Sequence, residues 1–151
     1  MKNSATIRVL HNNIVFVDCS LQPEILQLDI ILPSYRQQEN HMDPRIVLIS
    51  GCSSGIGLAT AVLLAKDAGK RFKVYATMRN LAKRGQLEEE GKEYLGDTLI
   101  IKQMDVCSDE SVNQTVQELV EMEGKIDVLC KYRDFSFPGP HFSECIKSAY
   151  E

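Results

Sequence analysis

The stretch Ile49-Ser50-Gly51-Cys52-Ser53-Ser54-Gly55-Ile56-Gly57 decides the fold. Its glycines follow residues 45–50, a mostly apolar run of the kind found in buried parallel strands. After them, apolar residues recur at helical spacing over residues 56–67. A strand, a glycine-rich turn and a helix in this order are typical of nucleotide-binding α/β units. We therefore expect this stretch to start a parallel sheet and to form part of a binding site.

The spacing of the glycines fits the chemistry of a pyrophosphate. One glycine permits the tight turn off the strand, another lets backbone N–H groups approach the phosphates, and the last lets helix and strand pack closely. The pyrophosphate then meets unpaired N–H groups and the positive end of the helix dipole. A glycine triplet alone is a weak signal, and the alternative is a turn without a ligand. The strand–turn–helix context favours the dinucleotide.

The rest of the central region continues as alternating strands and helices, which implies a parallel sheet with right-handed crossovers. Ser108 is a good N-cap for the third helix, and Gly124 ends it. The predicted fold class is α/β, a partial Rossmann-like parallel sheet of about four strands with crossover helices and irregular N- and C-terminal segments. The expected strands cover residues 45–50, 72–77, 99–106 and 126–130. The first two helices cover residues 56–67 and 80–95, and Gly85 and Gly91 interrupt the second.

The terminal segments lack this rhythm. Residues 1–44 are expected to form an N-terminal arm or linker, because prolines and a polar run punctuate them. Within this arm, residues 7–10 and 14–17 predict a weak hairpin. Residues 131–151 are expected to form an irregular tail. The nucleotide-binding half-domain thus spans residues 45–130.

The end of the second expected strand indicates which cofactor is preferred. Domains that bind NAD carry an acidic residue about 20 positions further on, where it holds the ribose 2′-hydroxyl. This strand ends in Ala76-Thr77-Met78-Arg79-Asn80, without a carboxylate. The Arg79 guanidinium can pair with a 2′-phosphate, and the hydroxyls of Ser53 and Ser54 can add donors. These residues predict NADP(H), and the alternative is that Arg79 is a solvated surface arginine.

The third expected strand ends near Asp105 and Val106. At the carboxyl edge of a parallel sheet, such residues face the ligand crevice. We expect Asp105 to accept a hydrogen bond from the adenine amino group and Val106 to pack nearby. The alternative is that Asp105 is a surface aspartate beside the start of the third helix, where this residue type is common.

Composition excludes several other classes of protein. The 151 residues carry a net charge of −4, so no overall basic field attracts nucleic acid. No apolar run approaches the roughly 20 residues of a membrane-spanning helix. The five cysteines are odd in number and widely spaced, and no Cys/His cluster offers a metal site. We expect reduced thiols, a cytoplasmic location and no transmembrane segment.

These stretches resemble the short-chain dehydrogenase/reductase family. Residues 50–57 match the cofactor motif of the family, with Ser50 in place of the usual threonine. Residues 74–79 and 104–112 are similar to the branch that holds steroid and retinol dehydrogenases. The resemblance implies hydride transfer between NADP(H) and a steroid or retinoid alcohol or ketone. It implies a cofactor site that comprises Gly51, Cys52, Ser53, Ser54, Gly55, Ile56, Gly57, Met78, Arg79, Asp105 and Val106.

The sequence departs from the family after residue 129. Cys130-Lys131-Tyr132-Arg133 stands where the family continues with Asn-Asn-Ala-Gly. The catalytic serine and the Tyr-x-x-x-Lys pair of the family lie further on, and no tyrosine of this sequence is followed four positions later by lysine. We therefore assign no catalytic residue and expect a truncated form that lacks the catalytic half.

Two functions stay open at this point. One is an NADP(H)-dependent oxidoreductase represented by its truncated form, and the other is a non-catalytic nucleotide-binding or interaction fragment. An unrelated nucleotide-binding domain is disfavoured by the extent of the match. A fragment of four strands would leave an open sheet edge and an uncovered apolar face. We expect marginal stability, or association through that edge.

Overall fold

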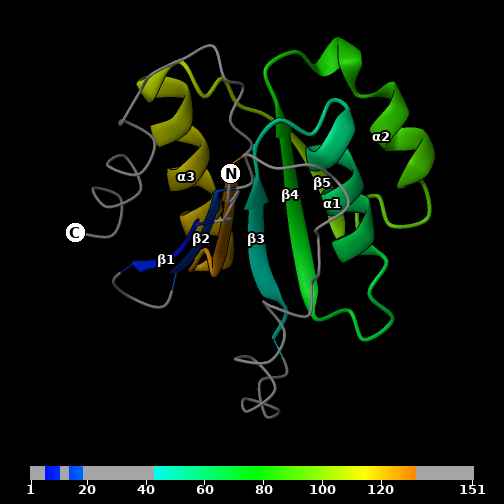
Figure 1. Cartoon of the computed structure of the whole chain (residues 1–151), viewed down its shortest axis with the longest axis horizontal. Helices are drawn as coiled ribbons and strands as arrows, with labels where there is room; N and C mark the ends of the chain where they lie inside the picture. The colour runs from blue at the N-terminus through cyan, green and yellow to red at the C-terminus, as the bar shows by residue number, and fades with distance from the viewer. Residues whose placement is uncertain (1–5, 11–13, 19–42, 132–151) are drawn as a thin grey trace, which may run out of the picture.

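The computed structural model of the protein describes residues 6–10, 14–18 and 43–131. In these residues, one sheet has the strand order β1-β2-β6-β3-β4-β5 (Figure 1). The predicted α/β fold is confirmed, because β3, β4, β5 and β6 form a parallel sheet connected through helices. The strands are β1 (Thr6–Leu10), β2 (Ile14–Asp18), β3 (Arg45–Ile49), β4 (Phe72–Met78), β5 (Leu99–Gln103) and β6 (Val128–Lys131).

The two longer helices lie where the sequence predicts them. Helix α1 covers Gly55–Ala65 and α3 covers Asp109–Glu123. The Ser108 side chain caps α3 by accepting a hydrogen bond from the backbone N–H of Ser111 at 3.3 Å. Gly124 ends this helix in the left-handed conformation, with φ +75°. Both predicted ends of the third helix are therefore confirmed.

The helix predicted over residues 80–95, with interruptions at Gly85 and Gly91, is confirmed only in part. The structure has a 3-10 turn, η5 (Leu81–Lys83), followed by the short helix α2 (Gly85–Glu90). The Asn80 side chain accepts a hydrogen bond from the Ala82 backbone at 2.9 Å, which favours the tight turn. A Cβ atom at Gly91 would overlap the Leu99 side chain, so the chain passes close to β5 there instead of continuing as a helix.

Strand β3 lies at the centre of the parallel part of the sheet. Val47 is in register with Val74 of β4 on one side and with Val128 of β6 on the other. The chain therefore moves from β3 outward to β4 and β5, and then returns to the other side of β3 to form β6. The order reverses between β3 and β6, which makes this position the topological switch point where doubly wound sheets bind ligands.

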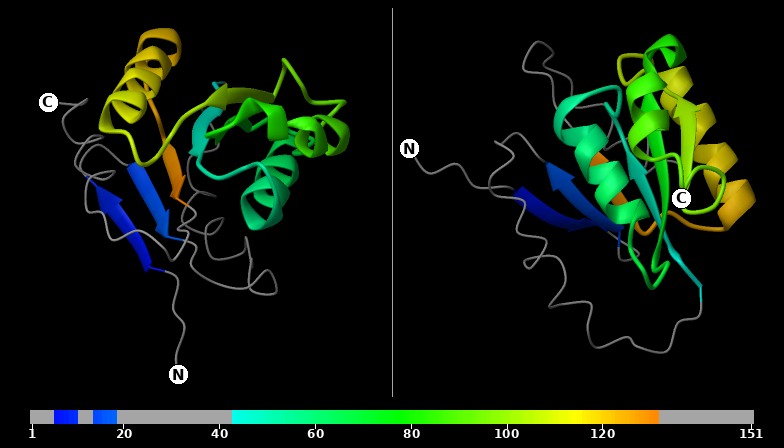
Figure 2. Two further views of the ribbon diagram at one scale, coloured as in Figure 1. Left: turned by 90° about the horizontal axis from the view of Figure 1, so that it is seen from above. Right: turned by 90° about the vertical axis from the view of Figure 1, so that its right-hand side faces the viewer.

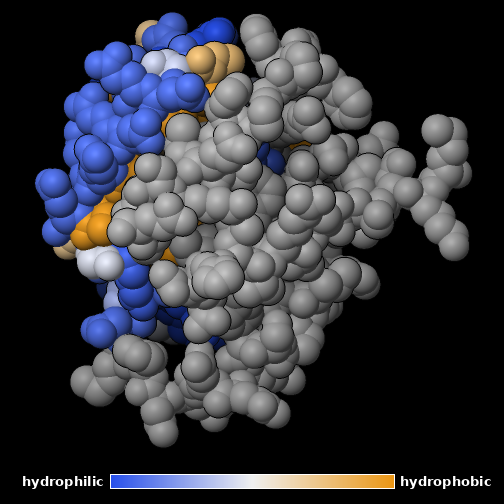
Figure 3. All heavy atoms as spheres, turned by 90° about the vertical axis from the view of Figure 1, so that its left-hand side faces the viewer, coloured by the Kyte–Doolittle hydropathy of each residue, from blue (hydrophilic) through white to orange (hydrophobic). Residues whose placement is uncertain are grey.

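Helices cover both faces of the sheet (Figures 1 and 2). Alternate residues of a strand point to opposite faces, so Val47 and Ile49 pack in the cluster beneath α1, whereas Ile46 and Leu48 pack in the cluster beneath α3. All four side chains are buried, which explains why β3 is hydrophobic at every position after Arg45. The outer side of the molecule near α3 shows mostly hydrophilic residues among those described (Figure 3).

The predicted N-terminal hairpin is confirmed in its backbone pairing. Strands β1 and β2 pair antiparallel, with Arg8 in register with Phe16. The sequence did not predict that β2 would also pair with β6, in parallel. The expectation of an open sheet edge therefore does not hold at β6, because β2 pairs with it. Lys131, predicted to begin the irregular tail, is the last residue of β6. Residues 1–5, 11–13, 19–42 and 132–151 of the predicted arm and tail lie outside the described residues.

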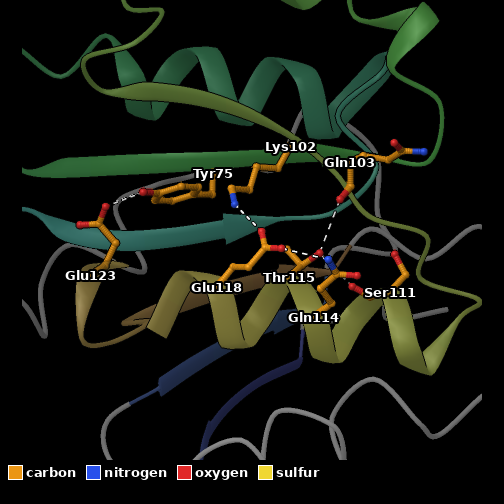
Figure 4. A network of polar contacts seen from close by, with 8 residues as sticks. All are labelled: Tyr75, Lys102, Gln103, Ser111, Gln114, Thr115, Glu118 and Glu123. Carbon is orange, nitrogen blue, oxygen red and sulfur yellow. Dashed lines mark hydrogen bonds and ion pairs between the residues drawn. The ribbon is translucent and has the colours of Figure 1, made fainter. Parts of the chain in front are cut away.

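Side-chain hydrogen bonds fix α3 against the sheet (Figure 4). Near the end of the helix, the Glu123 carboxylate accepts hydrogen bonds from Tyr75 Oη and Lys73 Nζ of β4, each at 2.5 Å. One turn earlier, Glu118 accepts from Lys102 Nζ of β5 at 2.7 Å. The helix therefore has defined contacts with two neighbouring strands in addition to its apolar packing.

The hydrogen bond between Tyr75 and Glu123 affects the pKa values of both side chains. Burial raises the pKa of Tyr75, and its hydrogen bond to Glu123 raises it further. For Glu123, burial alone would raise the pKa, but the hydrogen bonds from Lys73 and Tyr75 outweigh burial and hold the pKa below its ordinary value. The ionised carboxylate thus favours the folded state. This stabilisation is present above the unfolded pKa and is lost as pH falls through the folded pKa.

We expect Glu123→Gln to lower the free energy of unfolding near pH 7 by about 1 kcal/mol, because a neutral amide accepts weaker hydrogen bonds than a carboxylate. The difference from the unchanged protein should shrink as pH falls below the ordinary carboxyl pKa of 4.5. Urea unfolding at several pH values measures this. Glu121→Gln, at an exposed position of the same helix, is the control and should change little. If Glu123→Gln lowers the free energy of unfolding by the same amount at every pH down to 3, the charge of Glu123 does not contribute to stability.

Candidate functional site

The turn after β3 points its cysteine inward. The Cys52 N–H donates to the Thr77 carbonyl at 2.9 Å, and its Sγ–H donates to the Ile49 carbonyl at 3.4 Å. Burial raises the pKa of the Cys52 thiol to about 12, so the thiol stays protonated near neutral pH. Cys52 therefore anchors the turn to the end of β4. Neither its side chain nor its N–H is free for the predicted cofactor contact.

The glycines bring α1 close to the turn. Gly51 has φ +74°, in the left-handed region where glycine is favoured. A Cβ atom at Gly57 would overlap the carbonyl oxygen of Gly51, so only glycine fits there without a shift of the backbone. The predicted role of the last glycine in close helix–strand packing thus has a direct steric basis. The first turn of α1 is held directly against the end of β3.

The start of α1 is open among the described residues. Ser54 is the N-cap in an extended conformation, with φ −167°, and no side chain caps the helix. The first turn contains no acidic residue. Gly51, Ser54 and Gly55 are exposed, and Ser53 and Ile56 are half-buried. The first N–H groups of a helix have no intrahelical partner, so this end offers hydrogen-bond donors and a positive dipole to an anion.

The end of β4 carries one outward and one inward residue of the predicted site. Arg79 is exposed, and no carboxylate within the described segments lies within ion-pair distance of its guanidinium. Its backbone carbonyl accepts a hydrogen bond from the Gln103 side chain at 3.1 Å. Met78 is only 2% exposed and belongs to the core beneath α1. Its side chain is therefore part of the core and is not available to a ligand.

The residues after β5 form a hydrogen-bonded turn. The Asp105 carboxylate accepts from the Cys107 backbone N–H at 3.0 Å, and the Asp105 N–H donates to Ser111 Oγ at 3.0 Å. Asp105 is half-buried, and these hydrogen bonds give it a structural role in the turn, whereas its contact with adenine stays a prediction. Val106 is 40% exposed and presents an apolar surface beside this turn.

The sheet brings the three predicted groups to one edge. The glycine turn follows β3, Arg79 follows β4, and Asp105 follows β5, and these strands are parallel neighbours. Sequence reasoning missed Thr77, whose Oγ1 donates to the Ile49 carbonyl at 2.9 Å and whose own carbonyl receives the Cys52 N–H. The only signal was a hydroxyl residue in an otherwise apolar part of β4. Thr77 thus ties the turn to the strand that presents Arg79.

Two other kinds of feature, a metal site and a membrane-spanning helix, are absent from the described ranges. No group of three or more His, Cys, Asp or Glu side chains is placed to hold a metal ion there. Among the helices described, none has the length and apolar character needed to cross a membrane. The edge built from the glycine turn, Arg79 and the Asp105 turn is therefore the best-supported binding region of the described structure.

Comparison with known proteins matches the same region. A sequence model of the family described as short chain dehydrogenase matches residues 45–132. Human retinol dehydrogenase 8 is 53% identical over 97 residues, which are 64% of this chain and 30% of that protein. Mouse 17-beta-hydroxysteroid dehydrogenase type 1 is 44% identical over 90 residues, 58% of this chain and 26% of that protein. The resemblance seen in the sequence is confirmed, and the chain spans less than a third of these relatives.

Solved structures support the fold. A short chain dehydrogenase from Bacillus anthracis superposes with a TM-score of 0.52 and 27% identity, covering 64% of this chain and 37% of that one. Menthone neomenthol reductase from Mentha piperita gives a TM-score of 0.52 at 23% identity, covering 71% of this chain and 39% of that one. The second likeness concerns the fold alone.

We expect Gly57→Ala to destabilise the protein by about 1–3 kcal/mol, because the added methyl group must displace the Gly51 carbonyl. The same shift should disturb the open helix start and weaken nucleotide binding. Gly85→Ala is the matched control, since a Cβ atom there meets nothing within 4 Å. Thermal unfolding and a binding titration with NADPH measure the two effects. Equal stability and equal affinity of the two variants would contradict the close packing described here.

Proposed function

The chain belongs to the short-chain dehydrogenase family, and from that premise we propose that residues 45–130 are the NADP(H)-binding half of an oxidoreductase. Its reaction would move a hydride between the cofactor and an alcohol or ketone of a steroid or retinoid. The substrate class is supported by the similarity to retinol dehydrogenase 8 and to 17-beta-hydroxysteroid dehydrogenase type 1. The bound nicotinamide would supply the hydride chemistry.

The observation that carries this proposal is the open start of α1 at the switch point of the sheet. The backbone amides after Ser53 would hold the diphosphate, because no side chain caps them and no nearby carboxylate in the first turn repels an anion. The Ser53 and Ser54 hydroxyls stand beside these amides as further donors. Gly57 would act indirectly, by keeping the helix start at the end of β3.

The charge at the end of β4 supports NADP(H) over NAD(H). Arg79 is exposed beside the glycine turn, and residues 76–80 contain no carboxylate that would hold a free ribose 2′-hydroxyl. Asn80 is engaged, since its side chain accepts from the Ala82 N–H. A guanidinium with no carboxylate partner in the described structure is suited to bidentate pairing with a 2′-phosphate. Val106 would offer its exposed apolar surface to the adenine ring.

We expect Arg79→Ala to weaken NADPH binding roughly 10- to 100-fold, because a charge-assisted hydrogen bond to phosphate is lost. NADH binding, which involves no 2′-phosphate, should change little. Arg71→Ala is the control, since Arg71 precedes β4, at the opposite end of that strand from Arg79, and pairs with Asp67. Fluorescence titrations of the unchanged protein and both variants with each cofactor measure this. Tighter binding of NADH than NADPH, or equal losses in both variants, would contradict the role of Arg79.

A second candidate is that these 151 residues bind nucleotide without catalysis. The specific observation is that none of the five tyrosines is followed four positions later by lysine, the pair on which the family resemblance places the chemistry. On this proposal the chain binds NADPH but does not consume it when a retinoid aldehyde or a steroid ketone is added. Absorbance of NADPH followed over time tests this. A rate of oxidation proportional to protein concentration and dependent on the carbonyl compound would contradict the second candidate.

A further inference from the structure

Strand β6 is paired along both of its edges. On one side, Val128, Leu129 and Cys130 are in register with residues of β3. On the other side, the same three residues are in register with Val15, Phe16 and Val17 of β2. Both pairings are parallel. The second pairing joins segments that are more than 100 residues apart in the sequence, so it is a long-range feature of the fold.

The position of β2 corresponds to a defined place in a doubly wound sheet. Numbered from β3, the order β5-β4-β3-β6 is 3-2-1-4, the first part of the usual order 3-2-1-4-5-6. The next place beside β6 belongs to a fifth parallel strand in that order. Here β2 lies in that place and runs parallel to β6, although it comes from a segment that precedes β3 (Figure 2).

The sequences of β1 and β2 differ as expected for an edge strand and an inner strand of a sheet. Ile14-Val15-Phe16-Val17 is unbroken and apolar, as is typical of an inner strand of a parallel sheet. Strand β1, which lies at the outer edge, carries Arg8 at its centre, and a charge is a common feature of protected edge strands. Asp18 and Lys131 share a register position at the end of the β2–β6 ladder.

We propose that the β1–β2 hairpin acts as a cap on the sheet: β2 occupies the position beside β6 that the next parallel strand would take. While the cap is in place, the sheet cannot be continued at that edge, so the capped sheet and a longer doubly wound sheet exclude one another. When the cap is displaced, β6 presents an unpaired edge to an extended segment of a second copy of the chain. This proposal is independent of nucleotide binding.

The first test measures the β2–β6 pairing by a disulfide in the full chain. Val17 is in register with the native Cys130, and neighbouring strands lie about 4.8 Å apart, within the Cα separations that a disulfide spans. In a Cys19→Ser background, mild oxidation of Val17→Cys should link residues 17 and 130 within one molecule. Phe16→Cys is the matched control, since it is in register with Leu129 and adjacent strand residues point to opposite faces.

Peptide mapping and the mass of the oxidised protein read out this test. A 17–130 link in the monomer, at least several-fold more abundant than any link from position 16, supports the cap. Absence of that link, or equal links from both positions, overturns the proposal. A 17–130 link found only in covalent dimers also overturns it, because the edge of β6 would then be occupied by a second copy.

The second test removes the cap without shortening the chain. Phe16→Pro, at the centre of β2, deletes a backbone donor and should release the hairpin from β6. We expect this variant to elute from size exclusion as a dimer or larger species at concentrations where the unchanged protein is monomeric. Thr6→Pro, at the first residue of β1, is the control, since proline is tolerated there. A Phe16→Pro protein that stays monomeric and resists urea as well as the control would overturn the cap.

Discussion

The contact between the backbone of Gly57 and the carbonyl of Gly51 sets the geometry on which the candidate site depends. Because no side chain separates them, α1 begins directly above the end of β3 and aims its first amides at the carboxyl edge of the sheet. The Cys52 and Thr77 hydrogen bonds hold the same turn against β4. Cys52 faces inward in this turn, whereas Gly51, Ser54 and Gly55 are exposed.

The parallel pairing of β3, β4 and β5 places the residues of the candidate site at one edge of the sheet. Strands β4 and β5 deliver Arg79 and the Asp105 turn to the same edge of the sheet as the glycines. Helix α3 is held on the other face of the sheet by the Tyr75–Glu123 and Lys102–Glu118 hydrogen bonds.

Local patterns in the sequence predicted the strand–turn–helix unit, the α3 caps and the family, because each depends on residues close together in the chain. They did not predict that Met78 points inward, although it follows Val74 and Ala76 at the two-residue spacing of one strand face. The helix predicted over residues 80–95 is shorter than expected, because α2 ends at the predicted interruption at Gly91, where the close approach of Leu99 decides the path of the chain. The pairing of β2 with β6 could not be predicted, since no local signal specifies a partner so distant in sequence.

The central claim is that the amides at the start of α1 hold a diphosphate. The most direct measurement is the backbone amide NMR spectrum of the full chain during a titration with NADPH. The account predicts that the largest shift changes fall on residues 53–57, with smaller changes near Arg79 and Val106, and that Gly57→Ala reduces them. Shift changes confined to other parts of the sheet, with residues 53–57 unaffected at saturation, would contradict it.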